Sequence, residues 1–182
     1  MKRLVALMMF AGVCLGAAPA APLPSASIYQ LEAALTNQDG HSHGLDVYRG
    51  HPVLITMFYA SCPAACPLII DTLRATEKAL TPAQRADLRV LMISIDPERD
   101  SVTALRALAD QRRIDTSRWS LARADSAEVR TIAALLNVQY RQLPNGEFNH
   151  SSVITLLSPQ GEIEASSSHL GTADPTLVSQ LR

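Results

Sequence analysis

The sequence of 182 residues is poor in charged residues (18%), aromatic residues (4%) and cysteines, of which it has three. It has no long basic run, so the charge pattern that holds a nucleic-acid backbone is missing, and no nucleic-acid partner is expected. Hydrophobic residues make up 47% of the chain, which is typical of a folded protein and excludes disorder and a repeat array. The length suits one domain.

The N-terminal apolar stretch, Leu4 to Leu15, is shorter than the roughly 20 residues that a membrane-spanning helix needs. It follows Lys2-Arg3 and precedes the small residues Ala18-Pro19-Ala20, which is the pattern of an export signal. We therefore predict that residues 1–20 are a cleaved signal peptide and that the mature protein is periplasmic or otherwise exported. A retained signal would instead associate the domain with a membrane. Without Lys2 and Arg3, 14 basic residues face 17 acidic ones, a net charge of -3.

The scarcity of cysteine excludes a scaffold held together by disulfides. Cys14 lies in the predicted signal peptide, so the mature chain keeps only Cys62 and Cys66. A bridge across three intervening residues closes too short a loop to stabilise the fold much. The pair is therefore better explained by chemistry than by stability.

After a short linker at residues 21–27, the pattern of apolar and turn-forming residues predicts one domain over residues 28–182. It begins with a β-hairpin formed by a strand at 28–35, a turn at 37–40 and the segment 41–50. Residues 53–59, 89–95 and 119–122 are predicted strands, and the first is apolar nearly throughout, as a central strand should be. Helices are predicted at 67–80, from the cap Asp100 to 112, from the cap Ser126 to 136, and at 176–181. A second hairpin is predicted at 152–165.

Alternating strands and helices favour an α/β fold with a mixed central sheet, helices on both faces and an N-terminal β-hairpin. In such sheets ligands bind at the carboxyl ends of the parallel strands. This order is thioredoxin-like, and Cys62 and Cys66 follow a central strand at the start of a helix, where that fold would place them.

If residues 62–66 enter the helix, their four-residue offset puts both sulfur atoms on one face, within reach of a disulfide or of one shared metal ion. The positive end of the helix dipole favours thiolates, the reactive and metal-binding form. His150, expected in a loop before the strand at 152–157, is the best third donor. Two sulfurs and one imidazole suit Cu(I), whereas Zn(II) would require a fourth ligand. The alternatives are two small buried cysteines and an ordinary surface histidine.

Four sequence features together resemble those of the Sco/SenC family of copper-binding, thioredoxin-like proteins. They are Cys62-Pro63-Ala64-Ala65-Cys66-Pro67, the segment Asp96 to Asp100, Trp119, and His150-Ser151 before a strand. The similarity covers about residues 35–161. It implies that Cys62, Cys66 and His150 bind Cu(I) or Cu(II). It also implies that the protein delivers copper to the dinuclear copper site of cytochrome c oxidase, or reduces the cysteines of that site.

Two positions depart from the family pattern, because Ala64 and Asn149 stand where the family often has aspartate. The segment Asp96 to Asp100 is expected either to orient a loop or a partner, or to serve only as a helix cap with surface charges. His41 and His43 would share one face of a strand and offer an auxiliary copper site, the alternative being a solvated hairpin.

The leading hypothesis is an exported metallochaperone that is not a turnover enzyme. Its partners would be cytochrome c oxidase subunit II or another exported copper protein, with a thioredoxin-like reductant for the redox pair Cys62 and Cys66. The alternative is a thiol-disulfide oxidoreductase that reduces an exported copper protein. Such enzymes place a proline next to the cysteine pair, where this chain has His150-Ser151-Ser152, and the Arg and Thr expected beside a peroxidase cysteine are also missing.

Overall fold

The computed structural model describes residues 21–62 and 65–181, so the predicted signal peptide and Cys14 lie outside the described residues. In this part of the chain the main sheet has seven strands, in the order β2-β1-β5-β4-β3-β8-β9. Their bounds are β1 Leu35–Asn37, β2 Ser42–His43, β3 Val53–Phe58, β4 Arg89–Ser94, β5 Trp119–Arg123, β8 Ile154–Leu157 and β9 Ile163–Ser167. The helices are α1 Ala65–Lys78, α2 Pro82–Asp87, α3 Val102–Gln111, α4 Ser126–Leu135 and α5 Pro175–Gln180.

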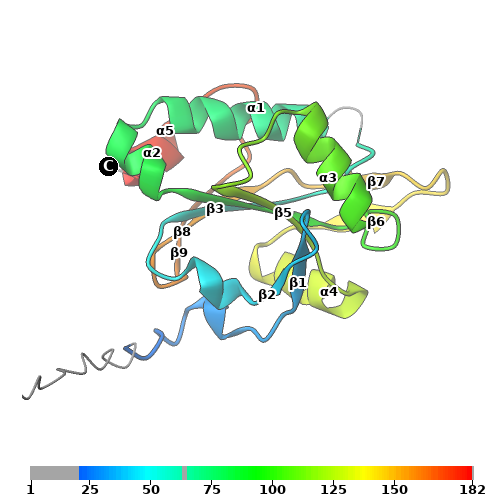
Figure 1. Ribbon diagram of the computed structural model, residues 1–182, viewed down its shortest axis with the longest axis horizontal. Coiled ribbons are helices and arrows are strands. Elements are labelled where there is room, and N and C mark those ends of the chain that lie inside the picture. Colours follow the sequence, from blue (N-terminus) through cyan, green and yellow to red (C-terminus); the bar gives the residue numbers. More distant parts are fainter. Residues whose placement is uncertain (1–20, 63–64, 182) are drawn as a thin grey trace, which may run out of the picture.

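The sheet is mixed, as predicted, and β3 is a central strand in it. β3 pairs in parallel with β4 and antiparallel with β8, while β4 also pairs in parallel with β5. All six β3 residues are buried, because α1, α3 and α5 cover one face of the sheet and α4 lies on the other (Figure 1). The apolar run therefore reflects burial on both faces, and the carboxyl ends of β3 and β4 meet at one edge.

The N-terminal hairpin forms, but its first strand is shorter than predicted. Ile28–Gln30 is a turn of 3-10 helix, and the strand occupies only Leu35–Asn37. Two cap assignments were also wrong. Ser101, not Asp100, caps α3 by accepting from the Ala104 N–H, and Asp125, not Ser126, caps α4 by accepting from two backbone N–H groups. Ser101 and Asp125 have the extended backbone that a cap requires.

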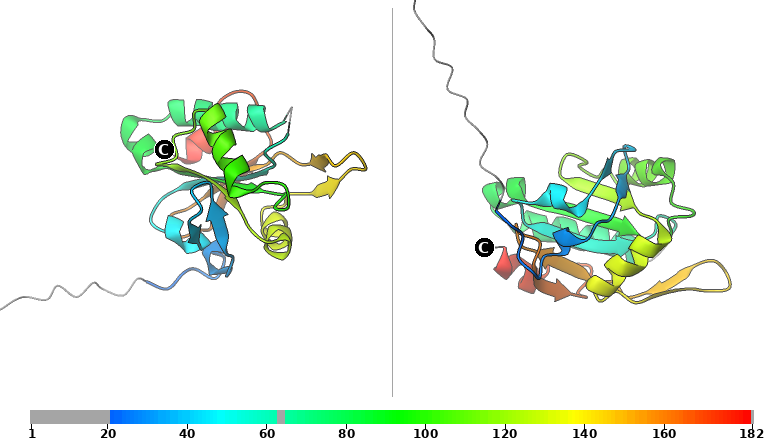
Figure 2. Two further views of the ribbon diagram at one scale, coloured as in Figure 1. Left: turned by 45° about the vertical axis from the view of Figure 1, so that its right-hand side comes forward. Right: turned by 90° about the horizontal axis from the view of Figure 1, so that it is seen from below.

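Among the α-helices and hairpins of the described residues, one helix and one hairpin were not predicted from the sequence. One is α2, which begins after Thr81 with a capping box. The other is the hairpin of β6 (Tyr140–Gln142) and β7 (Phe148–His150), a two-stranded sheet separate from the main one. It extends beyond the main sheet, at the end of the molecule opposite to the first described residues (Figure 2). His150 therefore lies in a strand and not in the loop that we expected.

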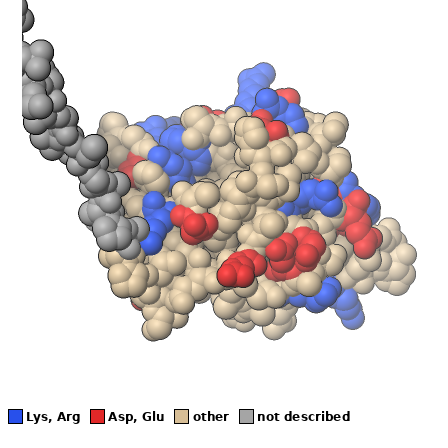
Figure 3. Space-filling view, turned by 60° about the horizontal axis from the view of Figure 1, so that its bottom comes forward, with Lys and Arg blue, Asp and Glu red and all other residues tan. Residues whose placement is uncertain are grey.

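The predicted linker at 21–27 contacts the rest of the domain. Leu23 packs against the core, and the Ser27 hydroxyl donates to the Gln160 carbonyl at 2.5 Å. Acidic and basic side chains are interspersed on the face shown in Figure 3, without a broad field of one sign. Within residues 21–62 and 65–181, no helix combines the length and hydrophobicity that a membrane span requires.

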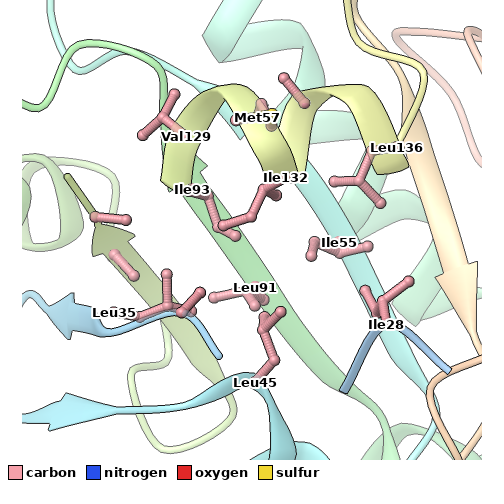
Figure 4. Close-up of a cluster of buried hydrophobic side chains, with 14 of the residues drawn as sticks. Ile28, Leu35, Leu45, Ile55, Met57, Leu91, Ile93, Val129, Ile132 and Leu136 are labelled. Atoms are coloured by element: carbon pink, nitrogen blue, oxygen red, sulfur yellow. The ribbon is translucent and has the colours of Figure 1, made fainter. Parts of the chain in front are cut away.

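Two apolar cores lie on opposite faces of the sheet. Alternate residues of β3 belong to different cores: Ile55 and Met57 face α4, whereas Leu54 and Phe58 face α1 (Figure 4). Tyr59, directly after β3, belongs to the core on the α4 side. Cys66 belongs to the core on the α1 side, and Cys62 packs against both cores. The predicted redox pair thus lies where the two cores meet the edge of the sheet.

Candidate metal centre

Cys62 and Cys66 share a backbone acceptor at the end of β3. Cys66 lies in the first turn of α1 and is 2% exposed, whereas Cys62 precedes the helix and is half-buried. The Tyr59 carbonyl accepts from the Cys62 N–H at 3.2 Å and from the Cys66 S–H, also at 3.2 Å. Both cysteines are thiols in this structure. Only the second of them lies within the helix, contrary to the prediction that both could.

The Cys66 thiol is harder to ionise than its place in the helix suggests. The helix N-terminus was expected to favour a thiolate, but burial raises the pKa of Cys66, and the neighbouring Cys62 raises it further. The cost of removing a thiolate from water is the largest contribution, and it outweighs the hydrogen bond with the Tyr59 backbone, which lowers the pKa. Cys66 is therefore protonated at neutral pH, and a soft metal ion would have to displace this proton to bind the sulfur.

His150, the last residue of β7, presents one ring nitrogen that could serve as a metal ligand. Its Nδ1 lies 3.2 Å from the Ser151 carbonyl, which can only accept, so Nδ1 carries the hydrogen. Its Nε2 is buried and has no hydrogen-bond partner in the described structure. Burial also lowers the pKa of His150, which keeps the ring neutral at pH 7. A buried nitrogen with a free lone pair fits a metal ligand.

Tyr59 connects the cysteine segment with the β6–β7 hairpin. The centroid of its ring lies 5.8 Å from that of His150 and 5.5 Å from that of Phe148. Its hydroxyl donates to Glu147 Oε2 at 2.7 Å. Burial, the hydrogen bond with Glu147 and an interaction with the Cys62 thiol raise the pKa of Tyr59. The sequence reasoning missed Tyr59 and Glu147, although a phenol at the end of a buried strand, three residues before Cys62, signals a need for a polar partner.

The acidic segment after β4 supports the loops of the site. The buried Asp100 carboxylate accepts from the Ala60 N–H at 2.9 Å and from the Ser94 hydroxyl at 2.5 Å. Asp96 is also buried and binds the Arg99 guanidinium. The two aspartates are buried, whereas Glu98 and Arg99 are exposed. Of the roles expected for the segment, loop orientation is the one that the contacts of the aspartates support.

Arg99 extends this support to the β6–β7 hairpin. Its guanidinium donates to the Gly146 carbonyl, and its central carbon lies 5.8 Å from the centroid of the Phe148 ring. An open cleft of about 470 Å³ lies beside His150 and is lined by Arg141 and Asn149 among others. One side of the hairpin is thus anchored to the domain and the other is accessible from solvent.

The predicted ligands are not yet assembled around a common point. In the parts of the chain that the structure describes, no three His, Cys, Asp or Glu side chains lie close enough to hold a metal ion. The ligand set Cys62, Cys66 and His150 therefore stays a prediction, and binding would require the cysteine segment and the hairpin to close on the metal. His41 and His43 form no such group either, and the His43 Nδ1 bonds instead with the Gly44 carbonyl.

Comparison with known protein families shows to which family this chain belongs. A family model described as SCO1/SenC matches residues 24–181. The chain belongs to the SCO1/SenC family. A SCO1 protein homolog of Bacillus subtilis (strain 168) is 26% identical over 139 residues, which cover 74% of this chain and 72% of that protein.

Solved structures of Sco proteins share the fold. Arabidopsis thaliana ScoI with copper bound has a TM-score of 0.68 and 21% identity, and the match covers 82% of this chain and 90% of that one. BsSco, described as a member of the Sco family of cytochrome c oxidase assembly proteins with a disulfide switch, has a TM-score of 0.68 and 23% identity. That match covers 87% of this chain and 95% of that one. The thioredoxin-like fold expected from the order of elements is thus confirmed.

The lowered pKa of His150 predicts a specific pH dependence. Because the folded pKa lies below the ordinary value of 6.5, the unfolded chain binds this proton first as the pH falls. Stability contributed by the neutral ring is therefore lost as the pH drops below about 6.5. An NMR titration of the metal-free protein should show the His150 ring titrating below 6.5, and His150→Gln should reduce the loss of stability in acid. A ring that titrates at or above 6.5 would contradict this expectation.

Asp100 should contribute to stability mainly as a hydrogen-bond acceptor. Asp100→Ala leaves the Ala60 N–H and the Ser94 hydroxyl unpaired, and we expect a loss of about 2 to 3 kcal/mol in the free energy of unfolding. Asp100→Asn keeps one oxygen that can accept both bonds and removes a buried charge, so it should cost less than about 1 kcal/mol. Urea denaturation at pH 7 distinguishes the two variants, and equal losses would show that the charge itself matters.

Proposed function

We propose that this protein is an exported metallochaperone that binds copper through the side chains of Cys62, Cys66 and His150. The buried, unpartnered Nε2 of His150 is the observation that carries the proposal. A polar atom without a partner costs free energy in a folded protein, and a metal ligand role explains why it is retained. The nitrogen lies on a ring that packs against Tyr59, whose carbonyl binds both cysteines.

The donor set suits copper. Two thiolates and one neutral imidazole form a soft, low-coordinate set that Cu(I) prefers, whereas Zn(II) would need a fourth ligand. Family membership supports the same cargo, because Arabidopsis thaliana ScoI is a relative in fold that has been solved with copper bound. Loading would release the Cys66 proton, and the Nδ1 hydrogen bond with Ser151 would keep the other nitrogen available.

The recipient that we propose is an exported copper protein, with the dinuclear copper site of cytochrome c oxidase subunit II as the first candidate. The relation to BsSco, from a family of cytochrome c oxidase assembly proteins, supports this choice. Thiol–disulfide exchange with an exported disulfide would oxidise Cys62 and Cys66 to a disulfide and reduce the other protein to a dithiol. The exchange would remove both sulfur ligands and release the copper, and a thioredoxin-like reductant would restore the thiols.

Copper titration of the reduced protein tests this proposal. We expect one Cu(I) per chain, with Cys66→Ser abolishing tight binding and His150→Ala weakening it at least roughly 100-fold, since a ligand should matter at least as much as a residue that only orients one. His169→Ala is the matched control, because it removes an exposed imidazole that hydrogen-bonds with Thr172 and should leave the affinity unchanged. An unchanged affinity and Cu(II) spectrum in His150→Ala would remove His150 from the site.

The unequal burial of the two cysteines favours one alternative, a thiol-disulfide oxidoreductase. Cys62, half-buried, could attack a disulfide of an exported copper protein, and the buried Cys66 would then displace the reduced partner. This chemistry requires both sulfurs but not the imidazole. Turnover of a disulfide substrate that persists in His150→Ala and is lost in Cys66→Ser would support the oxidoreductase over the metallochaperone.

A further inference from the structure

Tyr59 contacts all three predicted ligands. Its carbonyl oxygen accepts from the Cys62 N–H and from the Cys66 S–H, each at 3.2 Å. Its ring centroid lies 5.8 Å from that of His150, in an edge-to-face arrangement. The backbone of this residue thus holds the cysteine segment while its side chain packs against the histidine.

The hydroxyl of Tyr59 also attaches the β6–β7 hairpin to the domain. Tyr59 is 3% exposed, so its hydroxyl needs a partner, and the Glu147 carboxylate supplies one at 2.7 Å. Hydrogen bonds with charged acceptors are stronger than neutral ones. Glu147 lies immediately before β7, three residues before His150. A bond with Glu147 therefore limits where the histidine can lie.

The hairpin depends on such attachments. β6 and β7 form a two-stranded sheet that is not hydrogen-bonded to the seven-stranded one, and two-stranded hairpins alone are only marginally stable. A second attachment is the bond from Arg99 to the Gly146 carbonyl. The Arg99 side chain is about half exposed, whereas Tyr59 is buried in the core. The Tyr59 bond is therefore the less solvated of the two.

We propose that Tyr59 is a positioning residue, whose hydroxyl bond with Glu147 holds the β6–β7 hairpin, and with it His150, beside the cysteine segment. The consequence for copper rests on the proposed function, but the effect on the hairpin can be measured without any metal. Tyr59→Phe removes the hydroxyl and keeps the ring that packs against Phe148 and His150. The variant thus separates the interactions of the hydroxyl, with Glu147 and with the Cys62 thiol, from the packing of the ring, and the Glu147 variants single out the bond with Glu147.

Hydrogen exchange in the metal-free protein tests the effect on the hairpin. In Tyr59→Phe the amides of Leu143 and Ser151, which bond within and at the base of the hairpin, should exchange roughly 10-fold faster. The amide of Ile95, which donates to the Phe58 carbonyl at 2.7 Å, reports on the main sheet and should not change. Unchanged exchange at Leu143 and Ser151 would overturn the proposal, as would equal acceleration at Ile95.

Three further variants distinguish the loss of the Tyr59–Glu147 bond from a general loss of stability. Glu147→Ala breaks the same bond from the hairpin side and should reproduce the faster exchange, whereas Glu147→Gln keeps an acceptor and should restore most of the protection. Tyr140→Phe is the matched control, because it removes a tyrosine hydroxyl from the hairpin while keeping the ring contact with Phe148. Loss of protection in Tyr140→Phe equal to that in Tyr59→Phe would contradict a specific role for Tyr59.

Copper release then tests whether Tyr59 acts through His150. Transfer of Cu(I) to a high-affinity chelator should be roughly 10-fold faster from Tyr59→Phe than from the wild type. The same change made in His150→Ala should accelerate release no further, because the ligand that Tyr59 positions is already absent. An equal acceleration in both backgrounds would overturn the proposal.

The ligand role of His150 and the positioning role of Tyr59 can be tested separately. If His150→Ala leaves copper binding unchanged, the proposed function fails at its third ligand. If His150→Ala weakens binding while Tyr59→Phe changes neither hydrogen exchange nor release, the copper site stands and the positioning role of Tyr59 is wrong.

Discussion

The parallel pairing of β3 with β4 is the constraint on which the rest of the site depends. Because both strands run in the same direction, their carboxyl ends meet at one edge, where the cysteine segment follows β3 and the acidic segment follows β4. Asp100 joins the two segments by binding the Ala60 N–H and the Ser94 hydroxyl. The strands are buried on both faces, so this edge is the place where polar chemistry can be reached from solvent.

The chemistry of the site follows from burial. Loss of solvent keeps the Cys66 thiol protonated and the His150 ring neutral, so the predicted ligands carry little charge before a metal ion arrives. The metal-free site therefore leaves no unpaired charge on these residues in the core. If these residues bind copper as proposed, the site would exchange protons for metal, which suits a protein that binds its cargo and gives it up again.

Most of the fold was predictable because its signals are local. The largely apolar, fully buried strand β3, the helical spacing around Leu73 and the turn before Gly161 each follow from a short stretch of sequence. The caps at Ser101 and Asp125 were misassigned by one residue, since neighbouring Asp and Ser are equally good caps until the backbone geometry is known. The β6–β7 hairpin was missed because its strands are short, largely polar and not part of the main sheet.

The sequence by itself determined the order of strands and helices and the place of Cys62 and Cys66 after a central strand, and it led to the prediction that His150 is a third donor. Only the tertiary structure decided that Tyr59 and Glu147, 88 residues apart, bond with each other beside His150. It also decided that Cys66 is a buried thiol, although its position in the helix favours a thiolate. Hydrogen bonds between distant segments and the cost of burying a charge depend on which surfaces meet in space, and no local pattern of residues encodes that.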